Sequence, residues 1–195
     1  MRERKQAIAL IIFFVVILSS LFLFSDYRFT PLAAAKAHSD VGKNQTLLGD
    51  VDLGWGKVYI FDTDIGLRTV TSTKSSFLWR APVSVRIEKS EDVIKTVGWM
   101  SYTTKEGKQV TVLAVEANDP QVAYIEAGPA DNRVRKEITK DGPTIFSWNK
   151  AIQANNGLNA LALSADGSTL YEYRYPKNTN IFRAEDFRWY KTSGE

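Results

Sequence analysis

The chain has 195 residues, of which 44% are hydrophobic, and a net charge of +3 at pH 7. It contains no cysteine and one histidine, which excludes disulfides, thiol catalysis and a lipid-modified N-terminal cysteine and argues against a histidine-based triad or a zinc site. From residue 29 onward, 21 Lys and Arg are balanced by 20 Asp and Glu, so the composition argues against a nucleic-acid-binding protein.

Residues 7–24 read AIALIIFFVVILSSLFLF, with no charged residue, proline or glycine. At about 1.5 Å per residue this run crosses most of a hydrocarbon core of about 30 Å. Arg2, Arg4 and Lys5 precede it, so the positive-inside bias predicts a cytoplasmic N-terminus and an external remainder. The run is longer than the apolar region of a signal peptide and lacks a small-x-small cleavage site at its end. We therefore predict a retained anchor that binds the lipid bilayer through residues 7–24, with a cleaved signal peptide as the alternative.

Three segments are predicted along the chain. Residues 1–28 form the cytoplasmic tip and transmembrane signal-anchor, residues 29–43 a juxtamembrane helix and linker, and residues 44–195 a β-rich extracytoplasmic domain. The juxtamembrane helix is predicted because Thr30 is a suitable N-cap and Pro31 suits the first helical position. The predicted location is the plasma membrane, with a single pass and the C-terminal domain outside the cell.

The third segment is predicted to be mainly β. Residues 83–88 and 133–138 alternate between apolar and polar side chains, which is typical of half-buried strands. Residues 110–117 (VTVLAVEA) are apolar on both faces and predict a central strand. Further strands are predicted at 45–53, 57–63, 67–73, 93–103, 121–127, 143–148, 158–163 and 169–175. Many short strands separated by Gly-containing turns predict an antiparallel β-sandwich-like or barrel domain with one or two short helices.

The last of these strands places Tyr171, Tyr173 and Tyr175 on one face. A ladder of exposed aromatic side chains would be a large apolar patch on an otherwise charged surface. We therefore expect the three tyrosines to lie against the core, with a peptide- or glycan-binding strip as the alternative.

Several stretches carry a resemblance to known proteins. They read GWGKVYIFDTDIGLRTV, FLWRAP, TVGWMSY, DPQVAYIEAG and LNALALSADGSTLYEYRYP. Over nearly its whole length the chain resembles an uncharacterised family of small membrane-anchored Bacillota proteins with a β-rich exported domain. The resemblance implies an immunoglobulin-like sandwich in a Gram-positive cell envelope, and it brings no catalytic residues.

Two pairs of aspartates are the only candidates for a metal site. Asp50 and Asp52 share one strand face, as do Asp62 and Asp64, and calcium takes six to eight oxygen ligands. A hairpin that turns at Trp55 keeps the two pairs apart, so no metal ligand is predicted.

No catalytic residue and no cofactor is predicted either, because no pair of carboxylates is singled out for hydrolysis. Exposed aromatic side chains beside a cation are candidates for partner binding, and Trp55, Trp79 and Arg80 are the residues chosen. The sequence thus predicts a non-enzymatic interaction or sensing module of the cell envelope, with an envelope protein, peptide or glycan as partner. The alternative is a ligand-binding or hydrolytic envelope domain with a carboxylate-based site.

Overall fold

The computed structural model describes residues 4, 6, 10–16, 20 and 25–192. Residues 10–16 are helical, and their apolar side chains are between 55% and 66% exposed. No helix within the described ranges is long and apolar enough to cross a membrane. Much of the predicted anchor, residues 7–24, lies outside the described residues, so the anchor stays a prediction.

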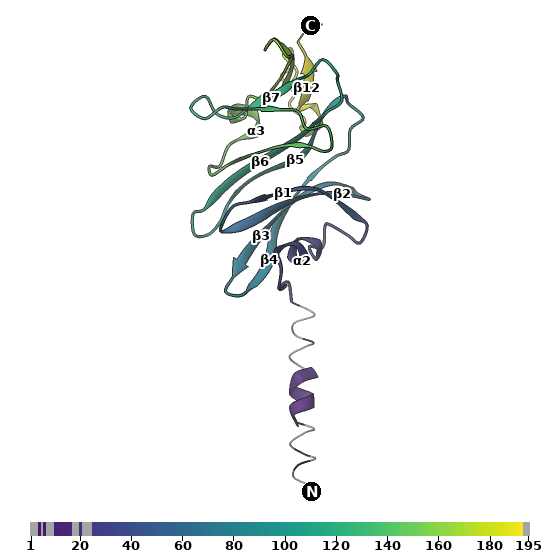
Figure 1. Cartoon of the computed structure of the whole chain (residues 1–195), viewed down its shortest axis with the longest axis vertical. Coiled ribbons are helices and arrows are strands. Elements are labelled where there is room, and N and C mark those ends of the chain that lie inside the picture. The colour runs from purple at the N-terminus through teal and green to yellow at the C-terminus, as the bar shows by residue number, and fades with distance from the viewer. Residues whose placement is uncertain (1–3, 5, 7–9, 17–19, 21–24, 193–195) are drawn as a thin grey trace.

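Between residues 25 and 192 the strands form three antiparallel sheets (Figure 1). The first sheet has the order β1-β2-β3-β4, which are Gln45–Asp52, Gly56–Thr63, Gly66–Ser75 and Leu78–Ile87. The middle sheet has the order β5-β6-β9, which are Ile94–Thr103, Gln109–Ala117 and Thr144–Trp148. The third sheet has the order β12-β11-β10-β7-β8, which are Arg188–Lys191, Thr169–Arg174, Leu161–Leu163, Tyr124–Ala127 and Val134–Glu137. The prediction of a mainly β domain with antiparallel sheets is confirmed.

Short helices complete the described part of the domain. Helix α2 (Pro31–Lys36) begins as predicted, because the backbone N–H of Ala33 donates to the Thr30 hydroxyl at 3.2 Å and proline occupies the first turn. Two further turns, α3 (Ala154–Gly157) and the 3-10 helix η1 (Ala184–Asp186), lie in the connections around the third sheet.

The layers stack in the order α2, first sheet, middle sheet, third sheet (Figure 1). Strand β2 shows why: Tyr59 and Phe61 pack in the cluster beside α2, whereas Val58 and Ile60 pack against the middle sheet. Successive residues of a strand point to opposite faces, so an apolar run is needed wherever both faces are covered.

Strand β6 occupies the centre of this stack. Its side chains at 112 and 114 pack toward the first sheet, and those at 113 and 115 pack toward the third sheet. All four are at most 1% exposed. The prediction that residues 110–117 form a central strand is confirmed.

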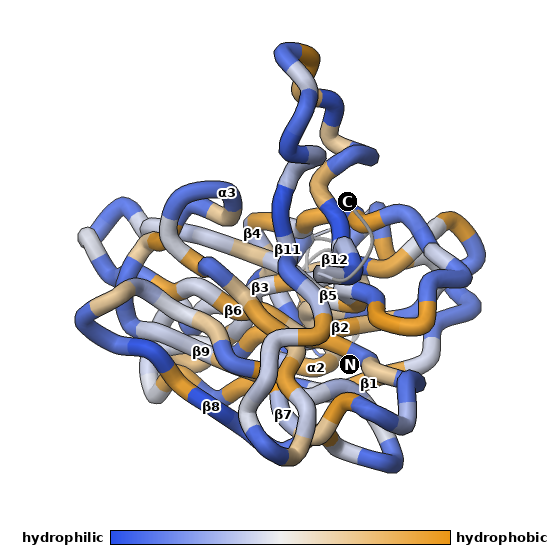
Figure 2. Tube along the Cα trace, turned by 90° about the horizontal axis from the view of Figure 1, so that it is seen from above, coloured by the Kyte–Doolittle hydropathy of each residue, from blue (hydrophilic) through white to orange (hydrophobic). Residues whose placement is uncertain are grey.

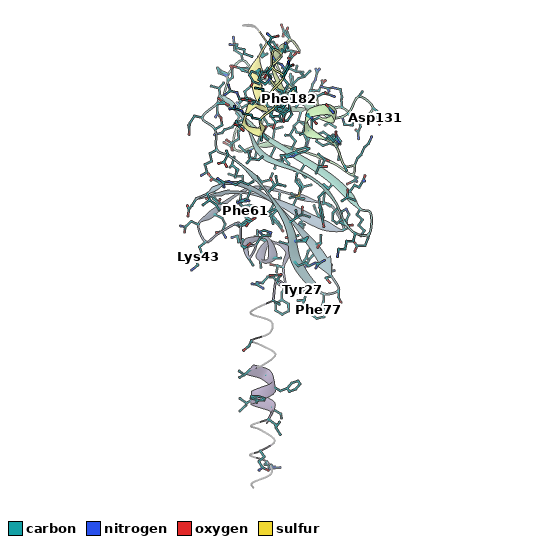
Figure 3. The ribbon with its side chains drawn as sticks, turned by 180° about the vertical axis from the view of Figure 1, so that it is seen from behind. Tyr27, Lys43, Phe61, Phe77, Asp131 and Phe182 are labelled. Carbon is teal, nitrogen blue, oxygen red and sulfur yellow. The ribbon has the colours of Figure 1, made fainter. Side chains whose placement is uncertain are left out.

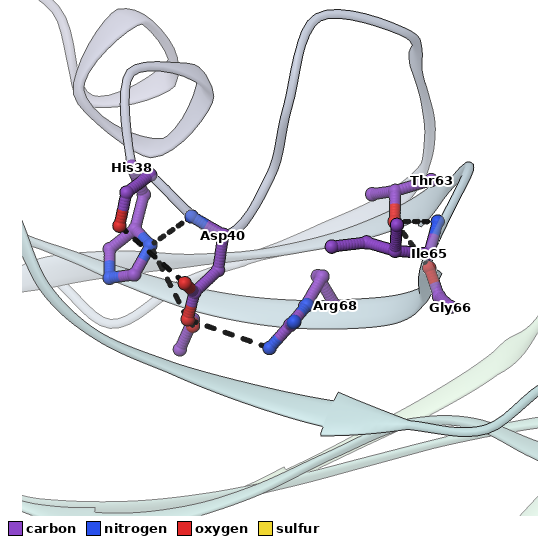
Figure 4. A network of polar contacts seen from close by, with 8 residues as sticks. His38, Asp40, Thr63, Ile65, Gly66 and Arg68 are labelled. Atoms are coloured by element: carbon purple, nitrogen blue, oxygen red, sulfur yellow. Dashed lines mark hydrogen bonds and ion pairs between the residues drawn. The ribbon is translucent and has the colours of Figure 1, made fainter.

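The loop after α2 is fixed to the first sheet through Asp40 (Figure 4). The Asp40 carboxylate accepts a hydrogen bond from Ser84 at 2.8 Å and lies 3.5 Å from the buried guanidinium of Arg68. The hydrogen bond from the Ser84 hydroxyl contributes most to holding the pKa of Asp40 below its usual value, and the charge of Arg68 lowers this pKa further. His38 takes part in the same loop: its side chain is 16% exposed, and its Nδ1 accepts the backbone N–H of Asp40 at 3.2 Å.

Candidate interaction site

The connection between β11 and β12, residues 175–187, leaves the body of the domain and is called the arm below. Figure 2 is a view along the long axis of the molecule. In it the arm projects sideways beyond the rest of the domain and ends in an apolar tip. The tip consists of Ile181 and Phe182, which are both 64% exposed. Figure 3 places Phe182 at the end of the domain opposite Tyr27 and Phe77.

A continuous run of aromatic rings supports the arm. Trp189 of the third sheet is only 7% exposed, and its ring centroid lies 5.2 Å from that of Tyr173. The run continues from Tyr173 to Phe187 at 4.3 Å, from Phe187 to Tyr175 at 4.9 Å, and from Tyr175 to Phe182 at 5.1 Å. Each tilted or edge-on ring pair contributes about 0.5–1.5 kcal/mol beyond the area that it buries. The rings therefore connect the exposed tip to the core.

Polar contacts fix the base and the turn of the arm. The Tyr190 hydroxyl donates to the carbonyl of Asp186 at 2.9 Å, and the guanidinium groups of Arg174 and Arg188 lie 4.8 Å and 5.3 Å from the Tyr190 ring. At the tip, the Thr179 hydroxyl both accepts the N–H of Ile181 and donates to its carbonyl, at 3.0 Å each. These contacts offset part of the conformational entropy that an ordered loop loses.

The predicted tyrosine ladder divides along this path. Tyr171 lies in the core, and its hydroxyl donates to Asp119 at 2.6 Å. Tyr173 packs on the edge of the same core, as expected. Tyr175 lies beyond the end of β11 and belongs to the arm, so for Tyr175 the expectation is wrong.

The predicted partner-binding residues fall in two places. Trp79 is half-buried, and its backbone pairs with that of Arg28, where the chain enters the domain. Trp55 is half-buried in the β1–β2 turn, with the Lys108 ammonium 5.9 Å from its ring centroid. Arg80 is exposed at the same end of the first sheet as this turn. The charges of Lys108 and Arg80 both help to lower the pKa of nearby Glu106, after the larger effect of its hydrogen bond with Thr104.

The aspartate pairs stay apart, as expected from a hairpin that turns at Trp55. Asp50 pairs with Tyr59 and Asp52 with Lys57, because Gly54 and Trp55 alone form the turn. The Asp52 carboxylate lies 3.1 Å from the Lys57 ammonium, and Asp64 accepts a hydrogen bond from Asn44. Among the described residues, no group of three or more His, Cys, Asp or Glu is placed to hold a metal ion.

A hollow with a volume of about 390 Å³ is a candidate place for the alternative, a carboxylate-based site. It lies between the end of β6 and the β8–β9 connection and is lined in part by Glu116, Asp119 and Lys140. The Tyr171 hydroxyl and then the Gln121 N–H lower the pKa of Asp119, so this carboxyl is ionised at neutral pH and unsuited to act as a general acid. Glu116 lies 3.3 Å from the Lys95 ammonium. Asp119 therefore does not have the raised carboxyl pKa that acid catalysis needs.

Comparison with known proteins finds no family model, no curated protein and no solved structure that matches the chain. The resemblance to membrane-anchored Bacillota proteins therefore stays a prediction. The arm was not singled out from the sequence, although FRAEDFRWY (182–190) places four aromatic residues close together in a polar stretch. That spacing is the signal that could have indicated a supported, protruding segment.

Proposed function

We propose that this chain is a single-pass, membrane-anchored interaction or sensing module of the bacterial cell envelope. Its anchor is residues 7–24, its N-terminus is cytoplasmic, and its β-rich domain lies outside and binds an envelope protein through the arm. The immunoglobulin-like arrangement implied by the resemblance is not needed for this proposal.

The exposed tip of the arm is the observation that carries the proposal. Ile181 and Phe182 are both 64% exposed, yet the ring run from Trp189 holds them out from the domain. An ordered apolar protrusion is typical of a surface that becomes buried against a partner. An aromatic anchor of this kind fits a pocket on a protein better than it fits a flat polar glycan.

The anchor is supported by two further observations. The apolar run of the sequence begins two residues after the basic residue Lys5. Seven successive apolar side chains in its described part, residues 10–16, are more than half exposed, which is unfavourable in water.

Site-specific crosslinking in membranes tests the proposal. A photoreactive amino acid replaces Phe182 in the full-length protein, and the matched control carries it at Ile65, a 53% exposed residue in the β2–β3 turn. We expect a discrete protein adduct from position 182 and none from position 65. Equal adducts from both positions, or none from 182, would contradict the proposed role of the arm.

A further inference from the structure

The place where the chain enters the domain is fixed to the β3–β4 hairpin. Arg28 and Trp79 form an antiparallel bridge with two backbone hydrogen bonds of 2.7 Å. The Arg28 guanidinium also donates to the carbonyls of Ser25 and Tyr27, at 2.6 Å and 2.8 Å. Figure 3 shows Tyr27 and Phe77 at the same end of the domain. The entry segment, residues 25–29, and the hairpin tip, residues 74–80, therefore form one surface, called the entry face below.

The entry face is close to the apolar run in the sequence. Ser25 directly follows residue 24, the last of that run. Arg28 is three residues further on and so lies at most about 11 Å from Ser25. A bilayer is about 40–45 Å thick with its headgroup regions and about 30 Å thick without them, so the interfacial layer on each side is about 5–8 Å thick. A chain that leaves the bilayer at Ser25 therefore brings the Arg28–Trp79 bridge to the lipid surface.

The entry face exposes large aromatic side chains. Phe77 at the hairpin tip is 72% exposed and Phe29 beside the bridge is 67% exposed, the two highest values among the large hydrophobic residues of the described chain. Trp79 is half-buried next to them. Aromatic side chains favour the boundary between headgroups and acyl chains, where the ring is desolvated.

The charge of the hairpin tip fits the same environment. Residues 74–80 read KSSFLWR, which includes two cations and no acidic residue. Lys74 is exposed at the tip, and Lys36 is exposed in the last turn of α2. The entry segment carries Asp26 and Arg28, which balance in charge. Basic side chains near a membrane surface are attracted to anionic headgroups.

We propose that the entry face docks on the lipid bilayer, with Phe77 and Phe29 in the interfacial layer and Lys74 toward anionic headgroups. The inference rests on the proposed membrane anchor and adds an orientation to it. The domain is held against the membrane at its α2 end, and the arm lies at the opposite end, where it projects sideways from the long axis (Figure 2).

The absence of cysteine allows a direct test. Full-length Phe77→Cys is labelled with an environment-sensitive fluorophore and reconstituted in vesicles of phosphatidylcholine and phosphatidylglycerol. Phe182→Cys is the matched control because Phe182 is similarly exposed at the far end. We expect the label at 77 to emit at shorter wavelength than the label at 182 and to be quenched several times more strongly by lipids with a spin label near the headgroup. Adding Lys74→Gln should weaken the quenching at 77 in anionic vesicles.

Flotation of the vesicles separates the possible failures. Protein that does not float with the vesicles overturns both the anchor and the docked face. Protein that floats with a water-exposed label at 77 overturns the docked face alone. A blue-shifted label at 77 that lipid quenchers do not reach indicates contact with a second protein copy and also overturns lipid docking.

Discussion

At the scale of single residues, the contact between Tyr171 and Asp119 joins the third sheet to the end of the middle sheet. The hydroxyl donates to the carboxylate at 2.6 Å over a sequence separation of 52 residues. The hydrogen bond to Asp119 and the burial of the phenol together raise the pKa of Tyr171 to about 12. A hydrogen bond to a charged acceptor contributes about 1.5–3 kcal/mol.

Tyr171→Phe should therefore lower the free energy of unfolding by about 2 kcal/mol at neutral pH. The folded-state pKa of Tyr171 is raised, so its contribution is fully present below pH 10 and is lost as the pH rises through about 12. The pKa of Asp119 is lowered, so on the acid side the contribution is lost only as the pH falls below the usual value of 3.8. Urea unfolding of both proteins from pH 4 to 11 measures the difference.

The Asp119→Asn background provides the control for this prediction. The charge-assisted bond is already weakened there, so adding Tyr171→Phe should cost clearly less than it does in the natural sequence. An equal cost in both backgrounds would mean that the hydroxyl is not stabilised by Asp119.

At the scale of elements, the contact between the first and middle sheets depends on Gly98 of β5. A Cβ atom at this position would lie 3.0 Å from the Ile60 side chain and 3.1 Å from the Cβ of Ala114. The ladder between β5 and β6 is irregular between Thr96 and Gly98, which brings the backbone of β5 close to β2. A side chain at Gly98 therefore has to push the two sheets apart.

We expect Gly98→Val to lower the free energy of unfolding by about 2–3 kcal/mol, the range for overpacking a core. Thr103→Val on the exposed part of the same strand is the control and should change it by about 0.5 kcal/mol or less. Thermal unfolding followed by circular dichroism checks both. Equal melting temperatures for Gly98→Val and the natural protein would show that the sheets do not approach each other here.

The sequence predicted elements well where local pattern determines them. Strand β6 carries apolar side chains on both faces, which predicts a strand that is covered on both sides. Thr30 and Pro31 mark the start of α2. Both elements could therefore be predicted from the sequence. Strand β12 was missed because it is four residues long and begins beside the 3-10 turn of the arm. Its Trp189 is buried because it packs in the core between the middle and third sheets, where its indole N–H donates to Thr96 of β5 at 3.2 Å.

The candidate site was less predictable because it depends on contacts between distant residues. The exposed aromatic residues chosen from the sequence included Trp55, which instead packs partly against the core between the first and middle sheets. The position of Phe182 follows from ring contacts with Tyr175 and, through Phe187, with Tyr173. Trp79 belongs to the entry face because its backbone forms a bridge with that of Arg28, and no periodicity in the sequence predicts this bridge.

At the scale of the whole molecule, the two proposed surfaces lie at opposite ends of the stack of layers. Figure 3 labels Phe77 at one end and Phe182 at the other. The entry face adjoins the apolar run and includes a hairpin of the first sheet, the arm extends from the third sheet, and the middle sheet lies between these two sheets. This polarity suits a domain that stands on a membrane and presents its arm to a partner in the envelope.

Cysteine accessibility in intact cells tests this account most directly, since the natural chain contains no cysteine. Ile65→Cys, at an exposed position outside the arm, and Gln6→Cys are each introduced into the full-length protein, and cells are treated with a membrane-impermeant maleimide before and after lysis. We predict that Ile65→Cys is labelled in intact cells once the cell wall admits the reagent, whereas Gln6→Cys is labelled only after lysis. The protein should also stay in the membrane pellet after carbonate washing. Labelling of Ile65→Cys only after lysis, or release of the protein by carbonate, would contradict an anchored, extracytoplasmic domain.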